Sequence, residues 1–261
     1  MAQGGCGLDP HRRLRRSVQA PLTLDAISQS LLLAGQLIMQ ADARLLGIVA
    51  LSLRVSFTAC CVGALLGLVL GCGLAVVRFP GHRIAVWAVN TLLALPSVVV
   101  GLLVYLLLSR SGPLGSLGIL FTPTAMVVAQ SILVVPLIAA LTRRLVLDGL
   151  REGGDQLRSL GAGPMLSALL MLVHLRMGVL IVLLSAFGRA VAEVGAVMIV
   201  GGNIDGVTRV MTTAIALETS KGDLPLALAL GLVLLAVVGL VNALVALLPS
   251  RGAAVREEAL V

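Results

Sequence analysis

Residues 177–201 read MGVLIVLLSAFGRAVAEVGAVMIVG, an apolar run long enough to cross a bilayer as one helix. Two ionisable residues, Arg189 and Glu193, fall near the middle of this run. An ionised side chain at the centre of a membrane span costs roughly 2.5–3.5 kcal/mol on insertion scales. Two such residues therefore indicate a helix whose polar side faces protein or a water-filled path instead of lipid.

The spacing of these two residues predicts how they interact. Residues four apart lie on the same face of a helix, so Arg189 and Glu193 are predicted to neutralise each other as an ion pair. Ionisable residues inside a span mark a functional interior by default. Two interpretations stay open, a pair that fixes the packing of helices and a group that contacts a substrate. We favour a packing pair that can open.

The composition of the whole chain also indicates a membrane protein. Hydrophobic residues make up 59% and charged residues 12%, and the mean hydropathy is +1.09. A soluble domain is nearer to half apolar and a quarter charged. The net charge of +7 comes almost wholly from arginine, with Lys221 as the only lysine. Because these cations border apolar runs, they favour a role in setting topology over nucleic-acid binding.

The motif content predicts neither an enzyme nor a metal site. Cys60, Cys61 and Cys72 lie in an apolar run without metal-ligand spacing and are interpreted as small hydrophobic residues. The pattern G-x-x-x-x-G-K-[ST] does not occur in the sequence, so the chain cannot bind ATP through that motif. We therefore expect no catalytic residue, no metal and no cofactor on this chain.

Hydropathy predicts an all-α integral membrane protein built as a bundle of five or six transmembrane helices. Segments of about 20 apolar residues qualify as spans. Five segments do so: residues 46–77, 84–108, 121–141, 177–200 and 224–248. Residues 22–39 are shorter and more polar, and they either form a sixth span or lie in the membrane interface.

The arginines predict the orientation of the spans, because cytoplasmic loops carry an excess of Lys and Arg. One set of connections is rich in arginine and is assigned to the cytoplasm. It comprises Arg78, Arg83, Arg143, Arg144, Arg151, Arg158, Arg176, Arg251 and Arg256. The opposite connections hold only Arg110, Arg209 and Lys221. This assignment gives a basic cytoplasmic tail at 1–21, a membrane domain at 22–248, an outer loop at 201–223 and a cytoplasmic C-terminal tail at 249–261.

The cytoplasmic loop at 143–176 is predicted to contain two short helices separated by a break. Gly161-Ala-Gly-Pro164 supplies the break, because glycine ends helices and proline begins them. A short amphipathic helix in such a loop either rests on the membrane surface or docks into a groove on a partner protein. The spacing alone does not separate these two alternatives.

This loop resembles the coupling segment of ABC importer permeases, whose pattern is E-A-A, three residues, G, nine residues and I-x-L-P. Asp155-Gln156-Leu157 stands in place of E-A-A, and Gly161 follows at the matching distance. The sequence departs from the pattern where Asp155 replaces glutamate and His174 stands in place of proline. The resemblance implies that this segment docks on a separate ATPase, and it selects Glu152, Asp155, Gln156, Leu157, Gly161 and Ala162 as coupling residues.

A second stretch of the sequence indicates which group of ABC importer permeases the chain resembles. Residues 188–224 contain R-x-x-x-E-x-G-A, then GGNI and a threonine-containing segment, and they closely resemble permeases of molybdate and tungstate importers. Residues 90–101, NTLLALPSVVVG, and 109–118, SRSGPLGSLG, extend the resemblance to about residues 45–248. The variant here is most similar to the tungstate branch. Molybdate or sulfate import is the alternative, and an ion-coupled secondary transporter is a less favoured one.

The resemblance implies an assembly in the inner membrane of a prokaryotic cell. A homodimer is expected, because five or six spans are too few to enclose a path for a hydrated dianion. Two ATPase subunits, which carry ATP and Mg²⁺, are expected on the cytoplasmic loops. A soluble binding protein is expected to deliver the substrate from outside. ATP binding and hydrolysis on the partner would then drive alternating access of this chain.

Several residues are candidates for the translocation path or its gate. Pro96 lies within an apolar run and is predicted to kink a helix, either along the path or as an inert packing feature. Small residues permit close helix approach or end a helix. The full set of path or gate candidates is Pro96, Arg189, Glu193, Gly195, Gly201, Gly202 and Asn203.

The outer loop offers hydroxyl groups and cations. Such donors suit a tetrahedral oxyanion, which presents only acceptor oxygens. A solvated loop that serves as a docking face for the binding protein is the interpretation we favour. The candidates for either role are Thr208, Arg209, Thr212, Thr213, Ser220 and Lys221.

Overall fold

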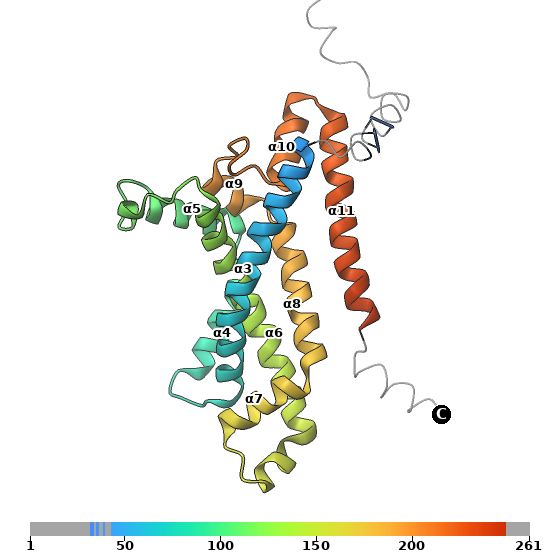
Figure 1. Cartoon of the computed structure of the whole chain (residues 1–261). Coiled ribbons are helices and arrows are strands. Elements are labelled where there is room, and N and C mark those ends of the chain that lie inside the picture. Colours follow the sequence, from blue (N-terminus) through green and yellow to red (C-terminus); the bar gives the residue numbers. More distant parts are fainter. Residues whose placement is uncertain (1–31, 34, 37–38, 40–42, 249–261) are drawn as a thin grey trace, which may run out of the picture.

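The computed structural model describes residues 32–33, 35–36, 39 and 43–248, and the residues it describes contain helices and turns but no strand. Figure 1 shows a bundle of long helices with shorter helices at both ends. The predicted tails at 1–21 and 249–261, and most of the segment 22–39, lie outside the described residues. The elements are α3 Ala43–Val76, α4 His82–Leu93, α5 Ser97–Leu108, η1 Gly115–Leu117, α6 Pro123–Ser159, α7 Pro164–His174, α8 Arg176–Val191, α9 Gly195–Gly201, α10 Met211–Lys221 and α11 Leu224–Leu247.

The helices confirm the all-α membrane class. Three of them, α3, α6 and α11, are each long and apolar enough to cross a bilayer. Two further pairs, α4 with α5 and α7 with α8, pass the same test only when each bent pair is taken together. Three of the five predicted segments thus lie in single continuous helices, and the described chain holds three to five candidate spans.

The other two predicted spans are broken. The segment predicted at 84–108 divides into α4 and α5, whose axes differ by 102°. Pro96 does not kink a continuous helix as predicted; it caps α5 with an extended backbone, at φ −62° and ψ 125°. A proline disfavours helical geometry in the residue before it, which explains a complete break at this point. The segment predicted at 177–200 likewise ends as α8 at Val191 and resumes as α9 at Gly195.

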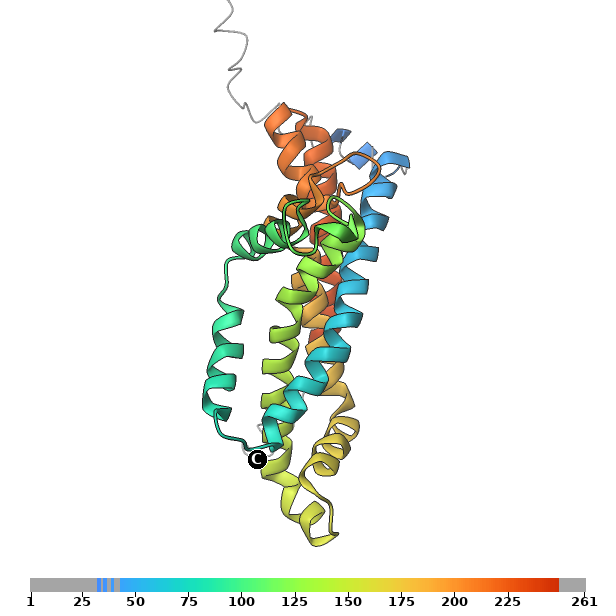
Figure 2. The ribbon, with the colours of Figure 1, turned by 90° about the vertical axis from the view of Figure 1, so that its left-hand side faces the viewer.

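The most extensive helix contact joins α3 to α6 and includes three glycines. Gly63, Gly67 and Gly71 are spaced four apart and therefore lie on one face of α3. A Cβ atom placed at Gly67 would lie 2.7 Å from the Cβ of Ile138, and one at Gly71 would lie 2.6 Å from the carbonyl oxygen of Ala139. The absence of side chains lets the two backbones approach closely, as in other membrane helix pairs. Figure 2 shows the two helices side by side along most of their length.

The predicted cytoplasmic loop is more helical than expected. Helix α6 continues without interruption to Ser159, so the first of the two predicted short helices is the end of a 37-residue helix. The predicted break is confirmed: Gly161 adopts a left-handed backbone with φ +80°, and Pro164 occupies the first turn of α7. We call the end of the bundle that carries this turn the α7 end.

The opposite end of the bundle, which we call the α10 end, carries α5, α9 and α10 (Figures 1 and 2). The connections at 77–81 and 160–163 lie at the α7 end, whereas those at 202–210 and 222–223 lie at the α10 end. The predicted coupling loop and outer loop therefore lie at opposite ends of the molecule.

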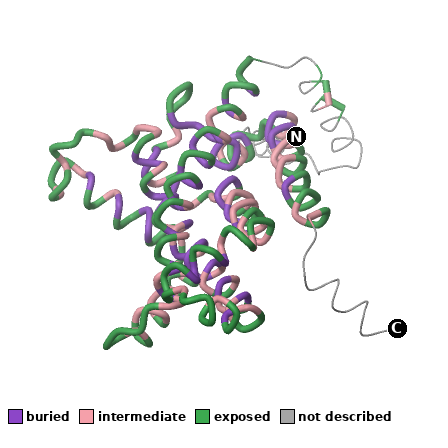
Figure 3. The backbone as a smooth tube through the Cα atoms, turned by 60° about the horizontal axis from the view of Figure 1, so that its bottom comes forward, coloured by how far each residue is buried: buried purple, intermediate pink, exposed green. Residues whose placement is uncertain are grey.

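The outer sides of the helices remain apolar. Large side chains such as Leu65, Trp87 and Leu235 are 70%, 68% and 72% exposed in the single chain. Buried positions follow the inner faces of the long helices, as Figure 3 shows. An exposed apolar exterior of this kind suits contact with lipid chains.

Candidate functional site

Two helix breaks meet at the centre of the candidate site. Helices α5 and α9, which follow the two breaks, pack directly against each other. A Cβ at Gly101 would lie 2.7 Å from the Cα of Ala196, and one at Gly195 would lie 2.8 Å from the Oγ of Ser97. These glycines hold the start of α9 against the start of α5. Broken helices within the membrane are tolerated where their free backbone groups face protein or a cavity.

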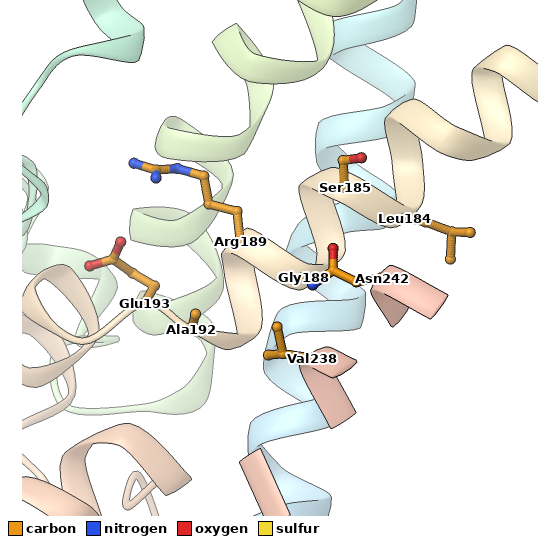
Figure 4. A pocket seen from close by; sticks show the side chains of 8 residues that line it. All are labelled: Leu184, Ser185, Gly188, Arg189, Ala192, Glu193, Val238 and Asn242. Carbon is orange, nitrogen blue, oxygen red and sulfur yellow. The ribbon is translucent and has the colours of Figure 1, made fainter. Parts of the chain in front are cut away.

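Arg189 borders the hollows around these breaks. One hollow of about 360 Å³ lies between α8 and α11, and Figure 4 shows the side chains that line it. They belong to Leu184, Ser185, Gly188, Arg189, Ala192, Glu193, Val238 and Asn242. A second hollow, of about 160 Å³, places Arg189 beside Leu92 and Leu95 at the α4–α5 break and beside Leu133 of α6. Arg189 therefore lies next to both breaks, the one between α4 and α5 and the one between α8 and α9.

The predicted ion pair between Arg189 and Glu193 is not present. Within the described part of the chain, Arg189 makes no ion pair within 4.0 Å and no hydrogen bond. Its side chain is exposed in the single chain. The helix ends at Val191, so the two residues do not share the continuous helical turn that the prediction assumed. Figure 4 shows the two charged groups as separate groups on the same side of α8.

Glu193 instead holds the start of α9. Its Oε1 atom accepts hydrogen bonds from the backbone N–H groups of Val194 at 3.1 Å, Gly195 at 3.0 Å and Ala196 at 3.5 Å. These are amides at the start of a helix that have no partner within the helix. The hydroxyl of Thr212 donates to the carbonyl oxygen of Glu193 at 2.8 Å, which ties the break to α10. The carboxylate therefore stabilises the start of α9 and the break that precedes it.

Glu193→Ala is expected to lower the free energy of unfolding by about 1–2 kcal/mol, because the cap at α9 is lost. Glu193→Gln keeps an acceptor oxygen and is expected to lower it by less than about 1 kcal/mol. Thermal unfolding of the purified chain in detergent measures both. If Glu193 acted through an ion pair with Arg189, the neutral Gln variant would be as damaging as the Ala variant.

Gln130 is a site residue that was not predicted from the sequence. It is 4% exposed on α6, and its Nε2 donates to the carbonyl oxygen of Ala190 at 2.9 Å. Its Oε1 atom has no hydrogen-bond partner among the described residues. Gln130, Arg189 and Glu193 line the same narrow gap between α6 and α8. A buried polar atom without a partner calls for an explanation, and this one belongs to a residue that borders the same gap as Arg189.

Asn242 and Ser185 were also missed. Asn242 is a lone polar residue in the apolar helix α11, which is the signal that could have identified it. Both residues line the larger hollow beside Arg189. An amide, a hydroxyl and a guanidinium thus belong to residues that border one hollow, with the guanidinium of Arg189 pointing away from Ser185 and Asn242 (Figure 4). Each of these groups can donate a hydrogen bond to an anion.

The predicted outer loop contains the helix α10, and three of its threonines are buried. Thr208, Thr212 and Thr213 are 0%, 6% and 0% exposed, so the expectation of solvated side chains is wrong for these three residues. The role of the loop as a docking face stays a prediction. Their hydroxyl groups bond within the protein: Thr208 donates to the carbonyl oxygen of Gly201 at 2.6 Å, and Thr213 donates to that of Val210 at 3.1 Å. These hydroxyls stabilise the chain reversal, so the structure does not present them to an external anion.

The cations of this segment are partly neutralised. Arg209 is 8% exposed and forms an ion pair with Asp205 at 2.9 Å, while Lys221 pairs with the buried Glu218 at 3.2 Å. Arg44 of α3 lies 3.7 Å from Glu218 and 3.4 Å from Asp205, so one charge network joins α3 to α10. Ser220 and Lys221 remain exposed at the end of α10. Of the predicted donors, these two are the ones accessible to a partner.

Gly201, Gly202 and Asn203 form the turn that ends α9. Gly202 is left-handed at φ +69°, and a Cβ there would lie 2.8 Å from the ring of Phe121. Asn203 is also left-handed, and its Nδ2 donates to the carbonyl oxygen of Thr213 at 3.3 Å. The structure thus gives these residues the helix-ending role, and their predicted part in a gate stays a prediction.

The predicted coupling residues lie together at the α7 end. Glu152, Asp155 and Gln156 are exposed on the last turns of α6. The turn is closed where Ala162 donates its backbone N–H to the carbonyl oxygen of Leu157 at 3.0 Å. This end therefore presents a short turn between two helices, with acidic and amide side chains exposed beside it.

Known proteins resemble the chain over most of its length. It is 41% identical over 222 residues to the tungstate uptake system permease protein TupB of Peptoclostridium acidaminophilum, covering 85% of this chain and 97% of that protein. It is 42% identical over 205 residues to a probable anion ABC transporter permease protein of Haloferax volcanii, covering 77% and 88%. A probable sulfate transport permease of Nephroselmis olivacea is more distant, at 30% over 162 residues. No family model matches the chain.

Proposed function

Because this chain belongs to the permease subunits of ABC anion importers of the tungstate type, we propose that it carries tungstate across the cell membrane. The observation that carries the proposal is the 41% identity that extends over 97% of a tungstate uptake permease. The chain is a multi-pass membrane transport subunit, and the proposal adds the ion and the mechanism.

The site around Arg189 supports an oxyanion as the cargo. Tungstate is a tetrahedral dianion that offers only acceptor oxygens, so it requires donors and positive charge. Arg189 supplies a guanidinium whose donors no described residue occupies. Ser185 and Asn242 add a hydroxyl and an amide in the same hollow. Because three backbone amides already bind its Oε1 atom, the carboxylate of Glu193 is held in place by the start of α9.

The proposal includes a symmetric assembly. Arg189 and Asn242 are exposed in the single chain, although they lie along apolar helices. A second copy of this chain would cover that face and close a water-filled path around it. Two ATPase subunits would bind at the α7 end, which would then lie in the cytoplasm, as would the C-terminus. A binding protein would dock at the α10 end. ATP-driven closure of the ATPases would expose the path alternately to each side.

Uptake by the complete importer tests the function. Cells without other oxyanion importers would express this chain with its ATPase and binding protein, and cellular tungsten would be measured by mass spectrometry. We expect uptake that requires an active ATPase and that excess molybdate reduces more than excess sulfate does. Uptake that continues with an inactive ATPase would overturn the ABC mechanism. Accumulation of sulfate in preference to tungstate would overturn the assigned ion.

Gly161→Val is expected to reduce uptake about 10-fold without loss of the folded permease. The left-handed backbone at φ +80° costs a residue with a side chain about 1–2 kcal/mol, and a β-branched residue more, so the turn should shift. Gly163→Ala is the matched control, because Gly163 has φ −67° and open space around it. Uptake and co-purification of the ATPase measure the effect. Equal activity of the two variants would contradict a coupling role for this turn.

A further inference from the structure

A separate hollow lies at the α7 end, remote from the site around Arg189. It measures about 380 Å³ and lies between the end of α3, the extension of α6 and the start of α7. Three arginines line it, Arg78, Arg151 and Arg158, and none of the described residues that line it is acidic. The other lining residues are apolar or small. The hollow is therefore a concave space whose charged side chains are all cationic.

The start of α7 adds further positive potential. Pro164 and Ser167 of its first turns line the hollow. Gly163, which caps the helix, has no side chain that could accept a hydrogen bond from the first amides. The free amides at a helix N-terminus carry a partial positive charge and favour anions. The start of α7 therefore favours an anion in the hollow, as the three arginines do.

Nearby carboxylates only weakly offset this charge. Arg151 pairs with Asp148 at 3.1 Å and Arg158 pairs with Asp155 at 3.6 Å, and both members of each pair are exposed, the arginines by 78% and 81% and the carboxylates by 65% and 101%. Exposed pairs of this kind are screened by solvent and contribute little. Arg78 makes no ion pair with any residue that the structure describes. Its charge is therefore available to a ligand.

We propose that this hollow binds a tetrahedral oxyanion of the phosphate type, and that its position favours the phosphate of an anionic lipid headgroup. Val76 and Arg78 lie where the apolar helix α3 ends, and headgroups are found where apolar spans end. Basic pockets beside transmembrane helices are suited to such headgroups. Arginine presents a planar fork of donors that matches two phosphate oxygens.

Binding to the purified full-length chain in neutral detergent tests this site. Calorimetric titration would compare a short-chain phosphatidylglycerol, a short-chain phosphatidylcholine, inorganic phosphate and tungstate. We expect phosphatidylglycerol to bind and Arg78→Gln to weaken it on the order of 10-fold, as loss of a charge-assisted hydrogen bond predicts. Arg144→Gln removes an exposed arginine of α6 that does not line the hollow, so it is the matched control and should have little effect.

The ligands separate the possible sources of the anion. Binding of phosphatidylglycerol alone would identify a lipid headgroup, whereas equal binding of inorganic phosphate or tungstate would identify a free oxyanion site. Either result supports the proposal when Arg78→Gln weakens the binding and Arg144→Gln does not. Equal effects of the two variants, equal binding of phosphatidylcholine, or no binding of any ligand would overturn it. The test does not depend on transport, so it remains separate from the proposed function.

Discussion

Gly71→Leu is expected to abolish accumulation of folded protein, whereas Gly73→Leu on the same helix is expected to leave it near the unmodified level. A Cβ at Gly71 would lie 2.6 Å from the carbonyl oxygen of Ala139 and 2.7 Å from the Cβ of Thr142. A backbone oxygen cannot rotate away as a side chain can, so α3 and α6 would have to separate. Gly73 has no atom within 4 Å of its Cβ position, which makes it the control.

The graded variant Gly71→Ala gives the size of the effect. Forcing one extra carbon into a packed interface typically costs about 1–3 kcal/mol. We expect Gly71→Ala to fall in that range, and Gly71→Leu to exceed the stability of the bundle. Size-exclusion profiles of the fluorescently tagged chain would report the folded fraction, and thermal unfolding would rank the variants. A Gly71→Leu variant as stable as Gly73→Leu would show that the close approach of the two helices is not required.

Arg189→Gln is expected to reduce tungstate uptake by roughly 10- to 100-fold, because a hydrogen bond to a charged group is worth about 1.5–3 kcal/mol. Arg189→Glu should abolish uptake, since it places a carboxylate where the dianion must pass. Arg189→Lys should retain part of the activity, because it keeps the charge but loses the planar fork of donors. Arg83→Gln, at an exposed position of α4, is the control for loss of one arginine.

The measurement must separate transport from assembly. Uptake would be measured alongside co-purification of the ATPase and the thermal stability of each variant. We expect all Arg189 variants to fold, because Arg189 has no partner among the described residues whose loss would leave a buried charge. Normal uptake by Arg189→Gln would remove this residue from the proposed path.

The long helices could be predicted from the sequence because hydropathy is a sum over many residues. The apolar runs of α3, α6 and α11 each exceed the thickness of a bilayer, so no single residue decides them. The breaks could not be located in this way. Averaging across Pro96 or across Glu193 hides an interruption of a few residues, and both breaks lie inside runs that remain apolar overall.

The role of Glu193 shows why the site was only partly predictable. Four-residue spacing from Arg189 is equally compatible with an ion pair and with a cap on a following helix. The choice depends on where α8 ends, which the packing of Gly195 against Ser97 helps to fix. The burial of the threonines could not be predicted for the same reason, because it depends on contacts between segments that are distant in the sequence. Thr212, for example, donates to the carbonyl oxygen of Glu193, 19 residues away. By contrast, the four-residue spacing of Gly63, Gly67 and Gly71 is present in the sequence and is typical of closely packed membrane helices, although this contact was not among the predictions.

Helix α6 also has a mechanical consequence. Its 37 residues run from the Thr122 cap to the turn before Gly161 and carry Gln130 on the way. Such a helix is a rod about 55 Å long, and a tilt of about 5° moves its tip by about 5 Å. A displacement of the turn at Gly161 would therefore be transmitted through the single helix α6 to the contact between Gln130 and Ala190. Pro136, which lacks an N–H donor, lies between the two points and is the place where this lever would bend.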